Sequence, residues 1–466
     1  MGDSRVASLL AEVGGPVDAA DAATVVGQDP VLPCRFPVGE AAATALAAVG
    51  SMAARIWQER TGADQTVTVD VGRAATSLLS FVHQRIEPGT ETPLAPDARM
   101  DSRALVALYP GRDGRWIHLH GAFPHLAERT VRVLGCGDDP DADTVAQAVA
   151  QWDALDLEDA LAEAKTCGAA VRSTAEWRQH PQGQAVSAMA RVEVERIGDA
   201  DPKPVGDGRR PLGSVRVLDL TRVLAGPTHA RVLAEHGADA MLVNSPNLPN
   251  APAFVMDTSH GKLSTFLDLD DADDAATLRG LASTADVFCQ GYRGGALAKR
   301  GLGPDELAEL RPGIVYVTIN CYGDTGPWRE RPGWEQLAQS VTGLADAQGE
   351  PGRPTLMPAA ACDYTTGYLA ALGTMVALWR RSHEGGTWHV RASLCQTGNW
   401  FAELGPTCDP AAATPPDADD LDRWSVTTDT PFGRLRHLGP VAELSATPPR
   451  WTRPTVPLGT HQPAWP

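Results

Sequence analysis

Residues 221–227 form a turn with the residue types of an anion-binding loop. The turn follows the apolar run VRVLDL at 215–220 and precedes THARVLAEHG, which has a helical pattern. The unpaired N–H groups at the start of such a helix attract negative charge. A dinucleotide-binding loop would need GxGxxG here and an acidic residue at the end of the next strand. The turn is TRVLAGP and the next strand ends in Val243 and Asn244, so an NAD enzyme is disfavoured.

Other residues that could bind a metal ion or form disulfides do not cluster. His118 and His120 share one face of a predicted strand, but no third ligand stands nearby, so we expect a solvated pair and no metal site. The eight cysteines are scattered without a CxxC pair, which is typical of reduced thiols in the cytosol. The N-terminal residues lack the basic and apolar regions of an export signal, so we expect a cytoplasmic protein.

The overall composition argues against two classes of partner. Lys and Arg total 40 against 58 Asp and Glu, and the net charge of -18 opposes binding to nucleic-acid phosphates. No stretch approaches the ~20 continuous apolar residues of a membrane span. We therefore expect neither nucleic acid nor membrane as a partner, and a phosphate-bearing ligand needs a local basic pocket.

Strand and helix patterns alternate most regularly after residue 206 and predict an α/β domain at 206–402. The strand candidates are VRVLDL, ADAMLV, TFLDL, DVFCQ and IVYVTI. Their spacing by helices is typical of a doubly wound, Rossmann-like parallel sheet, which binds ligands at the carboxyl ends of its strands. Residues 85–205 predict a smaller α+β domain. The Pro-rich residues 403–466 predict a return segment with little secondary structure of its own.

An internal repeat aligns residues 46–71 with residues 369–394, with Gly50 over Gly373 and Val67 over Val390. Each copy has the pattern of an apolar helix, a polar turn with Gly, and a strand. The alternative is a chance similarity between two Ala-rich helices. Residues 1–84 are therefore predicted to be an N-terminal segment with a first copy of this helix and strand unit.

Several passages, taken together, resemble the family III CoA-transferases, which include formyl-CoA and carnitine CoA-transferases and the α-methylacyl-CoA racemases. They are VRVLDLTRVLAGPTHARVLAEHGADAMLV, HGKLSTFLDL, ADVFCQGYRGGALAKRGLG, CYGDTGPWRERPGWEQLAQ and ACDYTTGYLAALG. The small domain and the closing passage are similar to the later part of the same family. The order is permuted, because a first catalytic helix and the small domain precede the nucleotide-binding half.

The resemblance implies an acyl-CoA enzyme whose nucleophile is Asp363, the aspartate of ACDYTTG. A carboxylate that attacks an acyl-CoA thioester forms a mixed anhydride, and the CoA thiolate can then form an aspartyl-CoA thioester if water is kept out. Asp363 stands at the start of a helix predicted over 365–381, where the helix dipole favours the ionised form. An isolated Asp there would more often be an N-cap. In the first copy Glu40 takes this position, and its extra methylene predicts that it is not catalytic.

The same resemblance places CoA, as a substrate, against three stretches of the chain, and it implies no metal. Cationic side chains can form charge-assisted bonds to the CoA phosphates, and a tyrosine ring can stack on adenine. For each cation the alternative is a solvated surface position. The predicted CoA-binding residues are Arg222, Val223, Leu224, Ala225, Lys262, Gly291, Tyr292, Lys299 and Arg300.

Three functions stay open, and transfer of CoA between carboxylic acids is preferred. An acyl-CoA racemase or isomerase would need a second proton carrier, and the matching position here is Trp334, whose indole does not exchange protons at neutral pH. Glu335 is therefore a secondary catalytic candidate, or else an ion-pair partner of Arg329 or Arg331. The third function is that of a non-catalytic CoA-binding protein. Because family members form interlocked dimers, the resemblance implies a homodimer that binds an acyl-CoA and a carboxylic acid.

Overall fold

The chain folds around one large sheet. The computed structural model describes residues 3–90, 103–206, 208–293 and 295–466. The sheet has seven strands in the order β10-β9-β8-β11-β12-β13-β7, and all neighbours are parallel except β13 and β7. The predicted α/β, doubly wound parallel sheet is confirmed. Its strands are β7 (Val192–Gly198), β8 (Arg216–Leu220), β9 (Asp239–Asn244), β10 (Lys262–Phe266), β11 (Val287–Gln290), β12 (Val315–Asn320) and β13 (Thr387–Ser393).

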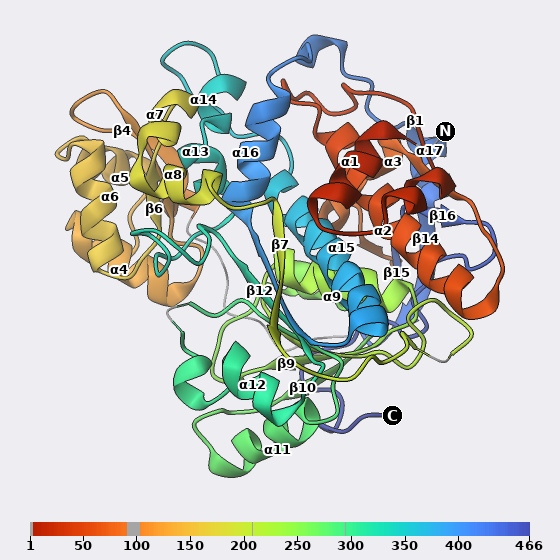
Figure 1. Cartoon of the computed structure of the whole chain (residues 1–466). Helices are drawn as coiled ribbons and strands as arrows, with labels where there is room; N and C mark the ends of the chain where they lie inside the picture. The colour runs from red at the N-terminus through yellow and green to blue at the C-terminus, as the bar shows by residue number, and fades with distance from the viewer. Residues whose placement is uncertain (1–2, 91–102, 207, 294) are drawn as a thin grey trace.

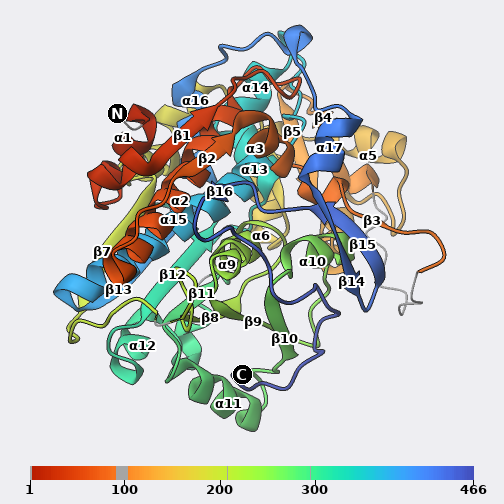
Figure 2. The same cartoon turned by 90° about the vertical axis from the view of Figure 1, so that its right-hand side faces the viewer.

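Helices cover both faces of the large sheet because its strands are apolar on both sides. Along β11, Val287 and Cys289 belong to one core cluster and Phe288 to another, as the alternation of side chains along a strand requires. Two helices cover one face and two others cover the opposite face (Figures 1 and 2). The first pair is α9 (Ala225–Glu235) and α15 (Ala361–Glu384), and the second pair is α11 (Ala272–Ala282) and α12 (Pro304–Leu310).

The order of the strands reverses direction between β8 and β11. The chain runs from β8 outward through β9 to β10, and it then returns to β11 on the other side of β8. At such a switch point the loops after the two central strands diverge and leave a crevice at the carboxyl edge of the sheet. Two of the predicted CoA-binding stretches, the turn after β8 and the loop after β11, therefore flank one crevice.

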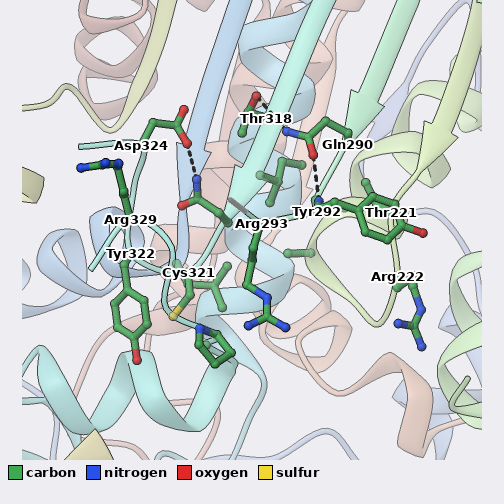
Figure 3. A pocket seen from close by; sticks show the side chains of 18 of the residues that line it. Thr221, Arg222, Gln290, Tyr292, Arg293, Thr318, Cys321, Tyr322, Asp324 and Arg329 are labelled. Atoms are coloured by element: carbon green, nitrogen blue, oxygen red, sulfur yellow. Dashed lines mark hydrogen bonds between the residues drawn. The ribbon is translucent and has the colours of Figure 1, made fainter. Parts of the chain in front are cut away.

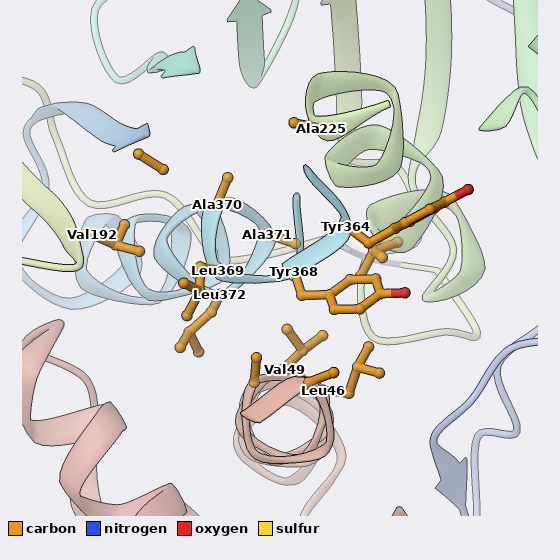
Figure 4. Close-up of a cluster of buried hydrophobic side chains, with 14 of the residues drawn as sticks. Leu46, Val49, Val192, Ala225, Tyr364, Tyr368, Leu369, Ala370, Ala371 and Leu372 are labelled. Carbon is orange, nitrogen blue, oxygen red and sulfur yellow. The ribbon is translucent and has the colours of Figure 1, made fainter. Parts of the chain in front are cut away.

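The repeat found in the sequence is also a repeat of structure. Both bounds of α2 (Val38–Thr61) lie 323 positions before those of α15. In each copy the helix is followed by a strand and a second helix, which are β2 (Val67–Asp70) with α3 (Val71–Ser77) and β13 with α16 (Leu394–Leu404). The two long helices pack on each other, and the buried side chains near this contact include Leu46, Val49, Tyr368 and Leu372 (Figure 4). N-terminal to the first copy are α1 (Ser4–Glu12), η1 (Val17–Ala22) and β1 (Ala23–Val26).

The segment 85–205 forms a small α+β layer beside the large sheet, and its residues 91–102 lie outside the described part of the chain. Its own sheet has the order β4-β5-β6. His118 and His120 on β5 are 1% and 8% exposed, so they are buried rather than solvated as expected. The segment ends in β7, which joins the large sheet. Its other elements are η3 (Arg103–Leu105), β4 (Val106–Pro110), β5 (Trp116–His120), α4 (Pro124–Leu134), α5 (Ala142–Val149), α6 (Ala154–Glu163), β6 (Gly168–Ala170), α7 (Thr174–Gln179) and α8 (Pro181–Ser187).

The segment 403–466 returns to the N-terminal part of the molecule, and it has more secondary structure than expected. The strand β15 pairs with β3 (Arg85–Ile86), and β16 pairs with β2 of the first repeat copy. In the described part of the chain, no helix combines the length and apolar character needed to cross a membrane. The segment contains η5 (Pro410–Ala412), α17 (Ala418–Trp424), β14 (Ser425–Thr430), β15 (Gly433–Leu438) and β16 (Glu443–Leu444).

Candidate active site

A cavity of about 690 Å³ opens at the carboxyl edge of the large sheet, at the switch point between β8 and β11. Its walls come from the loops after β8, β11 and β12, from the first turn of α15 and from the start of α4. Seven of the predicted site residues line it, namely Asp363, Arg222, Val223, Leu224, Ala225, Gly291 and Tyr292. The other four are not among the described residues that line it, namely Lys262, Glu335, Lys299 and Arg300.

The turn after β8 presents a half-buried cation to the cavity. The guanidinium of Arg222 lies 5.4 Å from the ring centroid of Phe123, and its Nε and Nη2 atoms are buried without a hydrogen-bond partner among the described residues. Burial lowers the pKa of Arg222. Val223 adopts a φ of 71°, which is strained for a β-branched residue and is typical of functional loops. Figure 3 shows Arg222 and Tyr292 on the same side of the cavity.

Lys262 supports this turn from inside the protein. Its side chain is fully buried, and its Nζ donates to Asp219 Oδ2 and to the Pro227 carbonyl oxygen, each at 2.7 Å. Asp219 in turn accepts the Thr221 N–H at 3.1 Å. Because both sides of the turn are tied to this buried ion pair, Lys262 fixes the shape of the loop at a distance from the cavity.

The loop after β11 brings two further predicted residues to the cavity and leaves two on the surface. Gly291 and Tyr292 line the cavity together with Arg293, which the sequence analysis did not single out. Lys299 and Arg300 are exposed on η4 (Ala298–Arg300). Arg300 pairs with Asp270 at 2.5 Å, so its charge is engaged outside the cavity.

Asp363 is the third residue of α15 and the only carboxylate of that helix's first turn. Its side chain is 6% exposed and lines the cavity. Among the described residues its carboxylate has no hydrogen-bond or ion-pair partner. Helix α15 begins without a capping side chain at Ala360. The first turn therefore places the positive end of the helix close to a free carboxylate.

Glu335, the first residue of α13 (Glu335–Val341), caps α15 from outside that helix. Its Oε2 accepts the Asp363 N–H at 2.6 Å, and its Oε1 accepts the Cys362 N–H at 3.1 Å. Gln339, one turn further along α13, donates from Nε2 to Glu335 Oε1 at 2.7 Å and accepts the Met357 N–H at 2.7 Å. Glu335 therefore positions the backbone of Asp363. Among the described residues, Glu335 forms no ion pair with Arg329 or Arg331, and Arg331 pairs with Asp159 instead.

The electrostatics at Asp363 differ from the sequence-based expectation that the helix dipole favours its ionised form. Burial raises the pKa of Asp363 well above its usual value, and the nearby charge of Glu335 acts in the same direction. Burial also raises the pKa of Glu335, while its hydrogen bonds from Gln339 and from α15 lower it. Two buried carboxyl groups thus share one helix N-terminus, and hydrogen bonds favour charge on Glu335 over charge on Asp363.

Residues at the start of α4 form part of the cavity wall, which sequence reasoning missed. Phe123, His125 and Leu126 at the start of α4 line the cavity together with Trp334. The Trp334 ring packs on His120 and Phe123, with ring centroids 5.5 and 5.6 Å apart, and its Nε1 lies 3.1 Å from Cys167 Sγ. In the described part of the chain no three His, Cys, Asp or Glu residues group as metal ligands.

In the first repeat copy, the acid at the matching position forms an ion pair with an arginine. Glu40 is the third residue of α2 and accepts from Arg5 Nη1 at 2.6 Å and from the Asp29 N–H at 3.3 Å. Asp29 Oδ2 accepts the Glu40 N–H at 2.7 Å. Asp29 therefore holds Glu40 in the way that Glu335 holds Asp363.

Comparison with known proteins gives consistent matches. The family model described as "CoA-transferase family III" matches residues 19–201 and 212–416. An "Acetyl-coenzyme A transferase nodX" of Hypoxylon pulicicidum is 33% identical over 336 residues, which are 66% of this chain and 56% of that protein. An "Acyl-CoA transferase" of Gibberella moniliformis is 30% identical over 507 residues, covering 92% of this chain and 89% of that protein.

A solved structure, of a CAIB/BAIF family protein from Brucella suis, is 29% identical over 41% of this chain and 55% of that chain, with a TM-score of 0.40. The chain spans about half the length of most of the curated relatives that it matches.

Proposed function

Because the chain belongs to CoA-transferase family III, we propose that it moves CoA from an acyl-CoA to a free carboxylic acid through covalent intermediates on Asp363. The observation that carries the proposal is a buried carboxylate without a partner, placed at a helix N-terminus inside a cavity that basic loops line. The names of the relatives, acyl-CoA and acetyl-CoA transferases, support the same reaction class.

The proposed reaction needs no net proton transfer. The Asp363 carboxylate attacks the thioester carbonyl, the C–S bond breaks, and CoA leaves as a thiolate from a mixed anhydride. The thiolate then attacks the Asp363 carbonyl, which releases the donor carboxylate and leaves an aspartyl-CoA thioester. The acceptor carboxylate attacks this thioester and forms a second anhydride. The thiolate attacks the acceptor carbonyl, which forms the new acyl-CoA and frees Asp363.

Each step has a group on the protein that supports it. Arg222, with two unpaired nitrogen atoms, and Arg293 supply positive charge for the phosphates of CoA. The positive end of α15 stabilises the negative charge that develops at Asp363. Phe123, Leu126 and Trp334 form an apolar wall that excludes water from the anhydride and the thioester.

Racemisation has less support than transfer at this site. A racemase must remove and return an α-proton with two bases. The indole of Trp334 takes the place of one base, and its N–H is directed at Cys167. Glu335 already accepts two backbone N–H groups and the Gln339 amide, so its oxygen atoms are engaged in holding α15.

Trapping of the intermediate tests the proposal directly. The protein is incubated with a panel of acyl-CoA thioesters and carboxylic acids, quenched with hydroxylamine, and its peptides are analysed by mass spectrometry. We expect a hydroxamate at Asp363 in the native protein and in Glu40→Gln, and none in Asp363→Asn. Exchange of α-deuterium without CoA transfer would identify a racemase, and the lack of any adduct with every thioester would favour a non-catalytic CoA-binding protein.

The predicted location and assembly belong to the same proposal. All eight cysteines are free, which supports a reducing, cytoplasmic setting. One chain by itself supplies both the small-domain wall and Asp363 to the cavity. The proposed homodimer of this 49.3 kDa chain is therefore not required to bring these two parts of the site together, and sedimentation analysis distinguishes it from a monomer.

A further inference from the structure

A chain of hydrogen-bonded side chains lines the cavity on three adjacent strands, and the proposed reaction does not use it. Gln290 on β11 pairs in register with Thr318 on β12, and Thr318 pairs in register with Arg391 on β13. His389, two residues before Arg391, lies between Thr318 and Arg391 in the chain of hydrogen bonds. All four side chains line the cavity. Figure 3 shows the Thr318 end of this chain.

The fixed donors at both ends of the chain determine the direction of every hydrogen bond. The Tyr292 N–H donates to Gln290 Oε1 at 2.8 Å, so the Gln290 amide nitrogen faces Thr318 and donates to its Oγ1 at 3.3 Å. The Arg391 guanidinium only donates, and its Nη1 lies 3.0 Å from His389 Nδ1. The imidazole proton therefore sits on Nε2, which donates to Thr318 Oγ1 at 2.9 Å. Burial lowers the pKa of His389 to about 3, in agreement with a neutral ring.

Thr318 Oγ1 thus receives two hydrogen bonds and has no lone pair left. Its own hydroxyl proton has no acceptor among the described residues. The residue is only 8% exposed, and a buried hydroxyl without an acceptor is costly. Since Thr318 lines the cavity, its hydroxyl can donate to water there, and a ligand that fills the cavity must replace this acceptor.

The position of Thr318 identifies which part of CoA supplies the acceptor. Thr318 shares a face of β12 with Tyr316, which packs in the cluster that includes Leu297 and residues of α11 and α12. Asp363 begins α15, which covers the opposite face of the sheet. The cavity therefore passes over the carboxyl edge from one face to the other. If the CoA sulfur is at Asp363 and the ligand follows the cavity to the other face of the sheet, its nucleotide half would lie toward Thr318.

We propose that the Thr318 hydroxyl donates a hydrogen bond to the adenosine 3′,5′-bisphosphate half of CoA, and that Gln290, His389 and Arg391 hold it in the donor state. The proposal rests on the proposed function for the identity of the ligand. It assigns recognition of the nucleotide to a strand residue next to an apolar wall of Tyr316, Leu297 and Pro304, in addition to the basic loops. An adenine ring can pack on this apolar wall, and the Thr318 hydroxyl can then donate to a ring nitrogen of adenine or to an oxygen atom of the attached ribose or phosphate.

Binding measurements on the full chain test this without turnover. CoA, adenosine 3′,5′-bisphosphate and pantetheine are titrated by calorimetry into the native protein, Thr318→Val and Thr318→Ser. We expect Thr318→Val, which keeps the shape and removes the donor, to weaken binding of CoA and of the bisphosphate by about fivefold to tenfold. Thr318→Ser keeps the hydroxyl and should stay within about twofold of the native protein. Pantetheine binding should be the same in all three.

Several outcomes would overturn the proposal. Equal affinity of Thr318→Val and the native protein for CoA would do so, as would an effect on pantetheine as large as that on the bisphosphate. A raised KM confined to the acceptor acid would assign the hydroxyl to that acid instead. Native protein that binds CoA but transfers none would overturn the proposed function alone, because the binding comparison at Thr318 still stands.

Discussion

The two repeat copies share one architecture, and only the second contains a candidate active site. In each copy an acid stands third in a long helix, and a second acid from outside that helix accepts its N–H: Asp29 for Glu40 and Glu335 for Asp363. They differ in what the first acid meets. Glu40 pairs with Arg5, whereas Asp363 lines a cavity without a partner among the described residues. The capped helix start is therefore a structural feature of both copies. The second copy has a candidate catalytic group because its carboxylate is free and lines a cavity.

The largest effect that distinguishes the two copies is on turnover. We expect Asp363→Asn to lower kcat by at least about a thousandfold, because the amide removes the nucleophile. Glu40→Gln should leave kcat within about twofold, since Glu40 already pairs with Arg5. Product formation by mass spectrometry with a fixed pair of acyl-CoA and acid checks both. Comparable losses in the two variants would mean that the copies share the reaction.

Replacement of the capping acids affects activity in one copy and stability in both. Glu335→Gln keeps one acceptor oxygen and loses the charge, so we expect a loss of about 1 kcal/mol in the free energy of unfolding and a fall in kcat of about tenfold to a hundredfold. Asp29→Asn should cost a similar stability and leave kcat unchanged. Urea unfolding and steady-state kinetics on the two variants check this, and a kcat loss in Asp29→Asn would break the comparison.

The glycines at matching positions of the two helices predict a graded loss of stability. A Cβ on Gly373 would lie 2.6 Å from Val192 Cγ1 and 2.8 Å from Val390 Cγ1, and a Cβ on Gly50 would lie 2.5 Å from Val67 Cγ1. We expect Gly373→Ala to cost about 2 to 3 kcal/mol and Gly50→Ala about 1 to 2 kcal/mol, because the first clash involves side chains of two strands. Equal midpoints in urea unfolding would show that the second copy is no more tightly packed than the first.

The smallest effect is a pH-dependent gain of stability in Asp363→Asn. Burial raises the pKa of Asp363 in the folded chain. At pH values above the usual carboxyl pKa, Asp363 therefore loses its proton more readily in the unfolded chain than in the folded chain. The native protein therefore loses stability as pH rises from that range through the raised pKa, while the variant does not. We expect Asp363→Asn to be more stable by about 1 kcal/mol at neutral pH, with no gain at pH 3. Thermal melts across this range measure the difference, and a gain that does not depend on pH would contradict it.

The parts of the site that depend on local sequence were predictable, and those that depend on several segments were not. The turn after β8 and Asp363 follow from apolar strands and helix starts that are visible in the sequence. Lys262 has the residue type of a phosphate ligand, but its burial is set by Asp219, which lies 43 positions earlier. The donor state of Thr318 depends on side chains from β11 and β13 that meet only through the register of the sheet.

The small α+β layer meets the rest of the molecule in two places. Its strands β5 and β6 contact α13, and at its end the chain continues into β7, which pairs with β13 over most of the strand. We expect a layer held at two places to move little as a unit, unlike a hinged lid. Entry of a ligand as long as CoA would then require small displacements of the loops that border the cavity. The size of these displacements limits how far the cavity opens.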